Sequence, residues 1–310
     1  MKRISETILF FGSGPVAAES LRLLAQDFTI EAVVTKPRPP HHKGDVPVMR
    51  VATQLGLTVF TASNKTQLDA LFATSPVESR IGVLIDFGII VSQKVIDYFP
   101  LGIINSHFSL LPQWRGADPI TFSILSGQRR TGVSLMLLVE KMDEGPLLAQ
   151  TPFDTENTMT TPQLTDALID VSYRTLQQIL PLYLHGEATP APQNAVTLAP
   201  TTPTYSRQLT KDDGWIDWHK TAGQLEREVR AYAGWPKSRT RIGNIEIVIT
   251  KARTVEEKGN PGVRAISNGE AMVYCGKGAL ILDELKPAGK KAMSGKAFLA
   301  GYRTAFIEAG

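Results

Sequence analysis

Residues 7–15 have the sequence TILFFGSGP, a short apolar run that leads into a glycine-rich turn and a proline. An unbroken apolar run of this length is typical of a strand buried on both faces, and proline is favoured in the first turn of a helix. Strand-like and helix-like segments of the same kind alternate as far as residue 98. The first half of the chain therefore predicts an α/β domain with a doubly wound, mostly parallel sheet, whose ligands bind beyond the carboxyl ends of the strands.

The turn Gly12-Ser13-Gly14 follows that strand and opens that helix, where backbone amides can hold an anion. The full dinucleotide fingerprint would need a third glycine at Ala17, and residues 33–36 offer no acid for a ribose. We therefore favour a plain tight turn over a nucleotide site, although the sequence leaves both open.

The later part of the chain has a different pattern. Residues 161–185 predict a long amphipathic helix, and the segment after it, rich in Ala, Pro, Thr and Gln, lacks apolar periodicity. We predict a first domain over 1–188, a linker over 189–205 and a second domain over 206–310. Short β-like pieces in the second domain favour a small β-barrel, because closure removes unpaired strand edges. Periodicity alone does not say whether this barrel is OB-like.

Composition indicates a soluble globular protein, since 43% of the 310 residues are hydrophobic and 20% are charged. No apolar run approaches the ~20 residues that span a membrane, and the first residues show no signal-peptide pattern. The single cysteine, Cys275, excludes an internal disulfide and is expected to be a packing residue. We expect a cytoplasmic protein without membrane association.

Charge is unevenly distributed along the chain. Residues 206–310 contain 18 Lys and Arg residues against 12 Asp and Glu residues, a surplus of six positive charges in a protein whose net charge is +3. The second domain is therefore the candidate polyanion surface. A solvated, lysine-rich face without a partner is the alternative.

Polar side chains gather in the stretch NSHFSLLPQWRG, residues 105–116, which follows a predicted strand. Asn105 and His107 are two residues apart, so they project to the same side while strand geometry persists. Asp143 follows another predicted strand and can approach from the neighbouring edge. These three residues form a candidate catalytic site. A core histidine with two turn-forming residues is the alternative that the residues alone leave open.

The stretch 105–116, together with Thr131-Gly132-Val133 and Asp143, resembles the signature of the folate-dependent formyltransferases. This resemblance implies a Rossmann-like first domain that uses 10-formyltetrahydrofolate as formyl donor. It implies that an amine attacks the formyl carbon and that the reaction passes through a tetrahedral oxyanion. By the same resemblance the catalytic residues are Asn105, His107 and Asp143, and the folate-binding residues are Phe87, Gly88, Ile89, Ser109, Leu110, Leu111 and Pro112.

Segments of the second half, above all residues 286–295 with the sequence KPAGKKAMSG, resemble the carboxyl-terminal domain of methionyl-tRNA formyltransferases. Ile216-Asp217-Trp218 and Trp235-Pro236 carry the same resemblance, which thus covers nearly the entire chain. It implies an OB-like second domain and initiator methionyl-tRNA as the acceptor, in translation initiation. The residues expected to bind the tRNA are Arg38, Lys43, Lys290 and Lys291. We expect a monomer.

Two segments depart from the family pattern. The loop over residues 36–47 is shortened and carries His41-His42-Lys43, so its contact with tRNA is open. Two adjacent histidines on a proline-rich loop rarely chelate a metal alone, and we expect no metal. Asp86 stands where the family usually has the alanine of an Ala-Tyr-Gly type sequence. It could accept hydrogen bonds from pterin amino groups or cap the end of a strand.

Two other functions stay open on the sequence. The first domain could formylate an amino sugar or a nucleotide, because enzymes with those acceptors share its signature. The chain could also bind folate or RNA without activity, although the retained Asn105, His107 and Asp143 argue against this.

Overall fold

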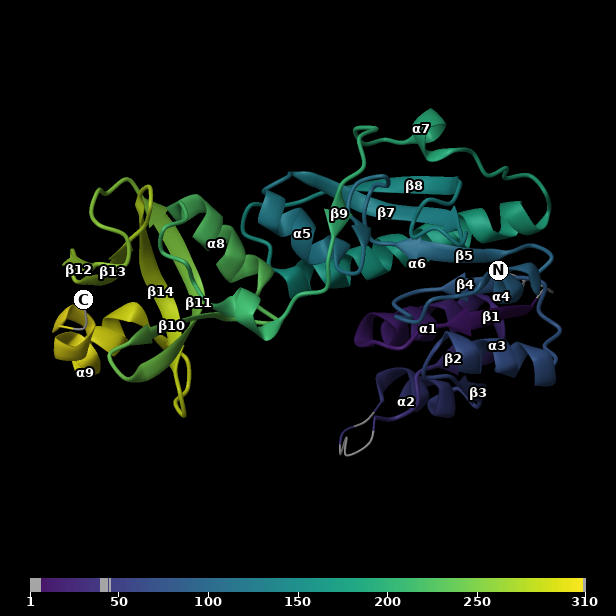
Figure 1. Ribbon diagram of the computed structural model, residues 1–310, viewed down its shortest axis with the longest axis horizontal. Helices are drawn as coiled ribbons and strands as arrows, with labels where there is room; N and C mark the ends of the chain where they lie inside the picture. The colour runs from purple at the N-terminus through teal and green to yellow at the C-terminus, as the bar shows by residue number, and fades with distance from the viewer. Residues whose placement is uncertain (1–6, 40–43, 45, 309–310) are drawn as a thin grey trace. The chain divides into compact units, whose positions relative to one another are not determined.

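The computed structural model describes residues 7–39, 44 and 46–308, which fall into two compact units (Figure 1). The first unit holds the described residues up to Pro119, together with Arg130–Asp154 and Thr165–Arg207. The second unit holds Ile120–Arg129, Thr155–Leu164 and the described residues from Gln208 onwards. The domain division over 1–188, 189–205 and 206–310 stays a prediction.

A seven-stranded sheet forms the centre of the first unit, in the order β3-β2-β1-β4-β5-β7-β8. Neighbours from β3 to β5 run parallel, whereas β5 with β7 and β7 with β8 are antiparallel. The prediction of a mostly parallel sheet is confirmed. The strands are β1 (Thr7–Phe11), β2 (Thr29–Thr35), β3 (Thr58–Thr61), β4 (Gly82–Leu84), β5 (Ile103–His107), β7 (Arg130–Leu137) and β8 (Leu147–Asp154).

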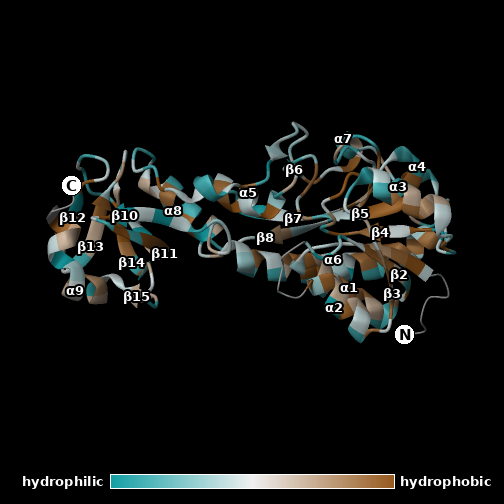
Figure 2. Cartoon of the chain, turned by 60° about the horizontal axis from the view of Figure 1, so that its bottom comes forward, coloured by the Kyte–Doolittle hydropathy of each residue, from teal (hydrophilic) through white to brown (hydrophobic). Residues whose placement is uncertain are grey.

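Helices cover both faces of this sheet, with α1, α2 and α6 on one face and α3 and α4 on the other (Figure 2). The order of the strands reverses between β1 and β4, and open α/β sheets bind their ligands beyond the carboxyl ends of the strands at such a point. The helices are α1 (Pro15–Asp27), α2 (Pro47–Gln54), α3 (Lys65–Thr74), α4 (Gln93–Asp97) and α6 (Thr161–Leu184).

The apolar run that opens the chain lies at the centre of this core. Every residue of β1 after Thr7 is buried. The Phe11 ring lies 5.9 Å from the ring of Phe72, 5.5 Å from that of Phe87 and 5.9 Å from that of Phe99, measured between centroids. Aromatic pairs at this spacing add stability beyond the burial of their area. The cluster joins β1 to α3 and to the segments that follow β4 and α4.

The second unit is built on an antiparallel sheet in the order β10-β11-β14-β13-β12, to which β15 adds beside β14. Among the described strands no ladder joins β12 to β10, so closure into an OB-like barrel is not confirmed. Its elements are η1 (Lys211–Gly214), α8 (Ala222–Ala231), β10 (Ser238–Ile242), β11 (Ile245–Val255), β12 (Arg264–Ser267), β13 (Glu270–Tyr274), β14 (Ala279–Pro287), β15 (Met293–Ser294) and α9 (Gly295–Glu308), and most of α5 (Pro119–Ser126) also belongs to it.

Helices α8 and α9 supply Leu225, Val229 and Phe298 to the core of this sheet. Cys275 is buried in the same core, as expected of a packing residue, and burial raises the pKa of its thiol to about 11. None of the helices in the described residues is both long and apolar enough to cross a membrane.

Replacement of Phe11 by alanine should lower the free energy of unfolding of the first unit by about 3–5 kcal/mol, because the change leaves a cavity among three aromatic rings. Chemical denaturation measures this change. Leu55→Ala is the control, since Leu55 is 42% exposed and should cost less than about 0.5 kcal/mol. Equal effects of the two substitutions would contradict this account of the core.

Candidate active site

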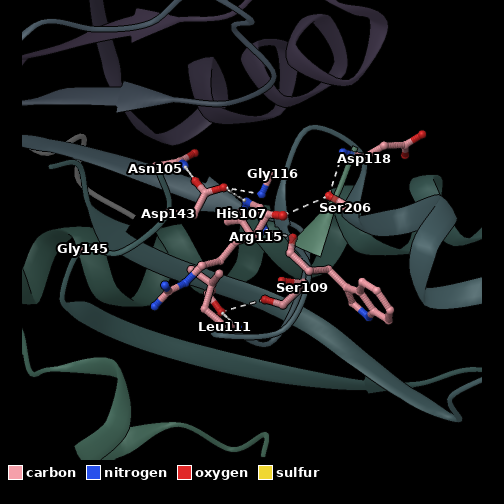
Figure 3. Close-up of polar contacts among 12 residues, drawn as sticks. Asn105, His107, Ser109, Leu111, Arg115, Gly116, Asp118, Asp143, Gly145 and Ser206 are labelled. Carbon is pink, nitrogen blue, oxygen red and sulfur yellow. Dashed lines mark hydrogen bonds and ion pairs between the residues drawn. The ribbon is translucent and has the colours of Figure 1, made fainter. Parts of the chain in front are cut away.

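Strand β5 ends in Asn105, Ser106 and His107, and all three side chains are buried. The alternation of a strand sends Asn105 and His107 to one side and Ser106 to the other. Ser106 accordingly pairs its hydroxyl with that of Ser172 on α6, at 2.7 Å. Asn105 and His107 both face Asp143, as their spacing predicts (Figure 3).

The Asp143 carboxylate is the centre of this cluster. Its Oδ2 accepts the backbone N–H of Gly116 at 2.7 Å and lies 3.8 Å from Nδ1 of His107. Its Oδ1 lies 3.5 Å from Nδ2 of Asn105. Asp143 follows β7 in the loop to β8, whereas Gly116 follows the stretch after β5. One buried carboxylate thus links the ends of two neighbouring strands.

Both nitrogens of the His107 ring face acceptors. Nε2 lies 3.0 Å from the backbone oxygen of Trp114, and Nδ1 faces the Asp143 carboxylate. With a carbonyl at Nε2 the neutral ring carries its proton there, and a second proton on Nδ1 would meet a carboxylate. The ring is thus oriented by an acceptor on the side of each nitrogen.

A glutamine far along the chain holds the Asp143 loop in place. Gln193, on the short helix α7 (Gln193–Val196), donates from Nε2 to the backbone oxygens of Asp143 at 2.7 Å and of Gly145 at 3.0 Å. Its Oε1 accepts from Arg115 at 2.8 Å, and Arg115 also pairs with Glu144 at 3.2 Å. Arg115 therefore clamps the loop.

The backbone around the cluster adopts left-handed conformations. Trp114 has φ of 55° and Asp143 has φ of 53°, in a region that costs non-glycine residues of order 1–3 kcal/mol. At Gly116, with φ of 114°, a Cβ atom would lie 2.3 Å from the backbone oxygen of Ser206. Strands β6 (Arg115–Gly116) and β9 (Tyr205–Ser206) pair there, which requires this close approach. The segment is thus fixed before any ligand binds.

The predicted folate wall over residues 109–112 is a buried, internally bonded turn. Ser134 donates to the backbone oxygen of Ser109 at 2.7 Å and accepts from the backbone N–H of Leu111 at 2.9 Å. Gln150 and Thr197 both donate to the backbone oxygen of Leu111. Leu110 and Pro112 are both buried. A ligand at this turn can therefore contact only atoms that do not already take part in these hydrogen bonds.

Asp86 follows β4, at the point where the strand order reverses. Its backbone oxygen accepts the N–H of Ser13 at 2.9 Å, and a Cβ atom on Gly14 would lie 1.9 Å from its Oδ2. The acid therefore covers the glycine-rich turn, and a phosphate placed there would meet a carboxylate. This contact supports the plain turn over the nucleotide site.

The surroundings of Asp86 raise its pKa to about 6. Partial removal of water is the largest cause, and the carboxylate of Asp118 acts in the same direction, whereas Lys36 opposes both. Lys36 follows β2, and its Nζ lies 2.8 Å from the position that a Cβ on Gly88 would take. Phe87 between these residues is buried, and Ile89 is half-buried.

The predicted tRNA-binding residues lie away from these strand ends in the sequence. Lys290 and Lys291 are exposed after β14, in a turn closed by the bond from the Lys290 N–H to the backbone oxygen of Pro287 at 3.0 Å. Arg38 is exposed after β2. Lys43 and the histidines at 41 and 42 lie outside the described residues. Within the described ranges no group of three potential metal ligands comes together.

Sequence comparisons cover both units. Residues 8–180 match the formyl transferase family, and residues 208–303 match the formyl transferase C-terminal domain. A methionyl-tRNA formyltransferase of Chloroflexus aurantiacus is 37% identical over 98% of this chain and 99% of its own. One of Roseiflexus sp. (strain RS-1) is 33% identical over 96% of this chain and 92% of its own.

The fold is also similar to solved structures. An N-formyltransferase of Helicobacter canadensis, crystallised with folinic acid and dTDP-3-aminofucose, superposes with a TM-score of 0.65. It is 16% identical, and the match covers 89% of this chain and 98% of that one. At this identity the similarity concerns the fold alone.

Replacement of Gln193 by alanine should lower the free energy of unfolding by about 1–3 kcal/mol, because the carbonyls of Asp143 and Gly145 lose a buried donor. Asn194→Ala on the same helix is the control, since Asn194 is exposed and should have little effect. Denaturant titration of both variants measures the difference. If the two variants were equally stable, Gln193 would not be holding the loop.

Substitutions around Asp86 should move its pKa in opposite directions. Lys36→Met should raise it above about 6, because the ionised carboxyl loses its cation, and Asp118→Asn should lower it. Carbon-13 NMR titration of the Asp86 carboxyl group measures both shifts. A pKa that stays constant in both variants would contradict the electrostatic coupling of the three residues.

Proposed function

The chain belongs to the methionyl-tRNA formyltransferases, and we propose that it transfers the formyl group of 10-formyltetrahydrofolate to the α-amino group of initiator methionyl-tRNA. The match to both halves of the formyl transferase family and the 37% identity over nearly the full length support this acceptor. The observation that carries the chemistry is the buried cluster of Asn105, His107 and Asp143.

The reaction begins with attack of the amine on the formyl carbon and passes through a tetrahedral oxyanion before tetrahydrofolate leaves. Negative charge on that oxygen needs fixed hydrogen-bond donors, and one well-placed donor is worth ~2.7–4 kcal/mol of barrier. Asn105 Nδ2 carries two N–H groups, and Asp143 lies near the amide at 3.5 Å. The proposed oxyanion donors are the second N–H of Asn105 and the Nδ1–H of a protonated His107, which lies 3.8 Å from the Asp143 carboxylate and makes no short hydrogen bond to it.

Asp143 has two proposed tasks. It orients His107 and balances the charge of the imidazolium. It also receives the proton of the attacking amine, directly or through a water molecule, and this proton passes to N10 of the folate as the bond between N10 and the formyl carbon breaks. Its carboxylate is held by the Gly116 N–H at 2.7 Å, which fixes it without neutralising it. No covalent intermediate on the protein is needed.

The folate is proposed to lie along the ends of β4 and β5. Phe87, Gly88 and Ile89 follow β4, and the turn over residues 109–112 follows β5, its parallel neighbour. Asp86 stands at the edge of this region with a pKa of about 6, so it can offer either a carboxylate or a protonated carboxyl to a pterin. The pH of the assay decides which of these two forms of Asp86 predominates.

The second unit is the proposed tRNA-binding part, together with Arg38 and Lys43 of the first half. The six surplus positive charges of residues 206–310 suit phosphate contacts, which supply most of the nonspecific affinity for nucleic acid. Lys290 and Lys291 are the first candidates, because both are exposed on a turn. The OB-like assignment of this unit, its boundary at 206 and the monomeric state are further parts of this proposal.

Alanine at position 107 and asparagine at position 143 should each lower the rate of formylation of initiator methionyl-tRNA about 10²–10³-fold, because each change removes a donor to the oxyanion or the group that orients it. Single-turnover kinetics with saturating 10-formyltetrahydrofolate measure the rate. His185→Ala is the matched control, since His185 is exposed and directly follows α6. Near wild-type rates in His107→Ala and Asp143→Asn would contradict the proposed site.

A further inference from the structure

The second unit contains a hollow of about 790 Å³ beside the edge strand β10. The hollow is shallow and open to solvent. Two tryptophans and two arginines take part in its lining, and none of its nine lining residues is acidic. The residues that matter below are Trp215, Trp218, Thr240, Arg241, Gly262 and Arg264.

Its aromatic walls are fixed by hydrogen bonds of the surrounding chain. The N–H of Ile216 donates to the backbone oxygen of Arg239 at 2.9 Å, so the segment that carries Trp215 adds along the edge of β10. The indole N–H of Trp218 donates to Thr240 Oγ1 at 3.3 Å, and Trp218 packs against the core. Both indoles are half-buried, which leaves part of each open to the hollow.

The cations of the hollow have no carboxylate partner in the described part of the chain. Arg241 is exposed, and its guanidinium lies 5.5 Å from the centre of the Trp215 ring, over which the guanidinium of the buried Arg239 also lies, at 4.8 Å. Arg264 is half-buried and donates from Nη1 to the backbone oxygen of Phe306 at 3.4 Å. Removal of water lowers the pKa of Arg264, so an anion beside it would offset the cost of its burial.

Tryptophan rings beside guanidinium groups that lack a carboxylate partner have the chemistry that binds a nucleotide. Unpaired bases stack on aromatic side chains or on guanidinium planes, and their phosphates bind arginine. A cationic ligand is excluded, because the lining carries two positive charges and no negative one. A methylated lysine or an amine therefore cannot be the occupant.

We propose that this hollow binds one unpaired nucleotide of an RNA, with the base against Trp215 and the phosphate held by Arg241 and Arg264. The inference rests on the proposed function, since it makes the hollow a contact site for the tRNA acceptor. It adds a contact by base stacking to the phosphate contacts expected of the lysines.

The test compares Arg241→Gln and Trp215→Leu with Arg303→Gln, a change at an exposed arginine on α9 of the same unit. Anisotropy of labelled initiator tRNA gives the affinity at several salt concentrations. Arg241→Gln should reduce the slope of log affinity against log salt by about one, as the loss of one phosphate contact does. Arg303→Gln should leave the slope unchanged.

Trp215→Leu should weaken tRNA binding about tenfold with the slope unchanged, because stacking is not a charge effect. Trp215→Tyr keeps an aromatic face and should restore most of the affinity, which separates loss of stacking from loss of folding. Tenfold weaker binding in both Trp215 variants would overturn the stacking contact, as would wild-type affinity in Trp215→Leu and Arg241→Gln.

Two further readings separate the possible failures. Titration with cytidine monophosphate, followed by tryptophan fluorescence, measures binding of a free nucleotide to the hollow. If the nucleotide bound there while Arg241→Gln and Trp215→Leu left the affinity for tRNA unchanged, the assignment to RNA would be overturned. Formylation of methionyl-tRNA by the wild-type protein is measured in parallel. Formyl transfer together with unchanged tRNA binding in the variants would leave the proposed function standing and overturn only this inference.

Discussion

The hydrogen bond from the Gly116 N–H to the Asp143 carboxylate fixes the centre of the site, because it ties the stretch after β5 to the loop after β7. Asn105 and His107 face the same carboxylate only while this bond holds the two segments together. The left-handed backbone at Asp143 is maintained by donors from Gln193 and by the clamp of Arg115 on Glu144. The geometry of this cluster is thus built into the first unit before a substrate arrives.

The strand order explains why the polar groups meet where they do. Strands β4 and β5 are parallel neighbours, so the residues that follow them open at one edge of the sheet. Asp86, at the end of β4, lies against the turn after β1 and disfavours a phosphate there. The segments after β5 and β7 bring Asn105, His107 and Asp143 together. Proteins with this topology often bind a nucleotide phosphate at the first glycine-rich turn, whereas here the carboxylate of Asp86 lies against that turn.

Sequence patterns were sufficient where the physical cause is local. The period of two in a strand placed Asn105 and His107 on one side, and apolar runs predicted the parallel sheet. The sequence did not predict the role of Gln193, because this residue holds the Asp143 loop from 50 residues away and lies in a segment without periodicity. Contact between Asp86 and Gly14 depends on the pairing of β1 with β4, which periodicity does not specify. Barrel closure, expected from short strands, is not confirmed, since the paired strands end at β10 and β12.

We propose that the formyl-transfer site shared by this family serves a tRNA acceptor in this chain. A competition assay tests it most directly, with 10-formyltetrahydrofolate and equal amounts of initiator methionyl-tRNA, free methionine and an amino-sugar nucleotide, and with mass spectrometry of each product. We predict formyl transfer to the methionyl-tRNA alone. Transfer to the sugar alone, or no transfer although folate is bound, would contradict the account.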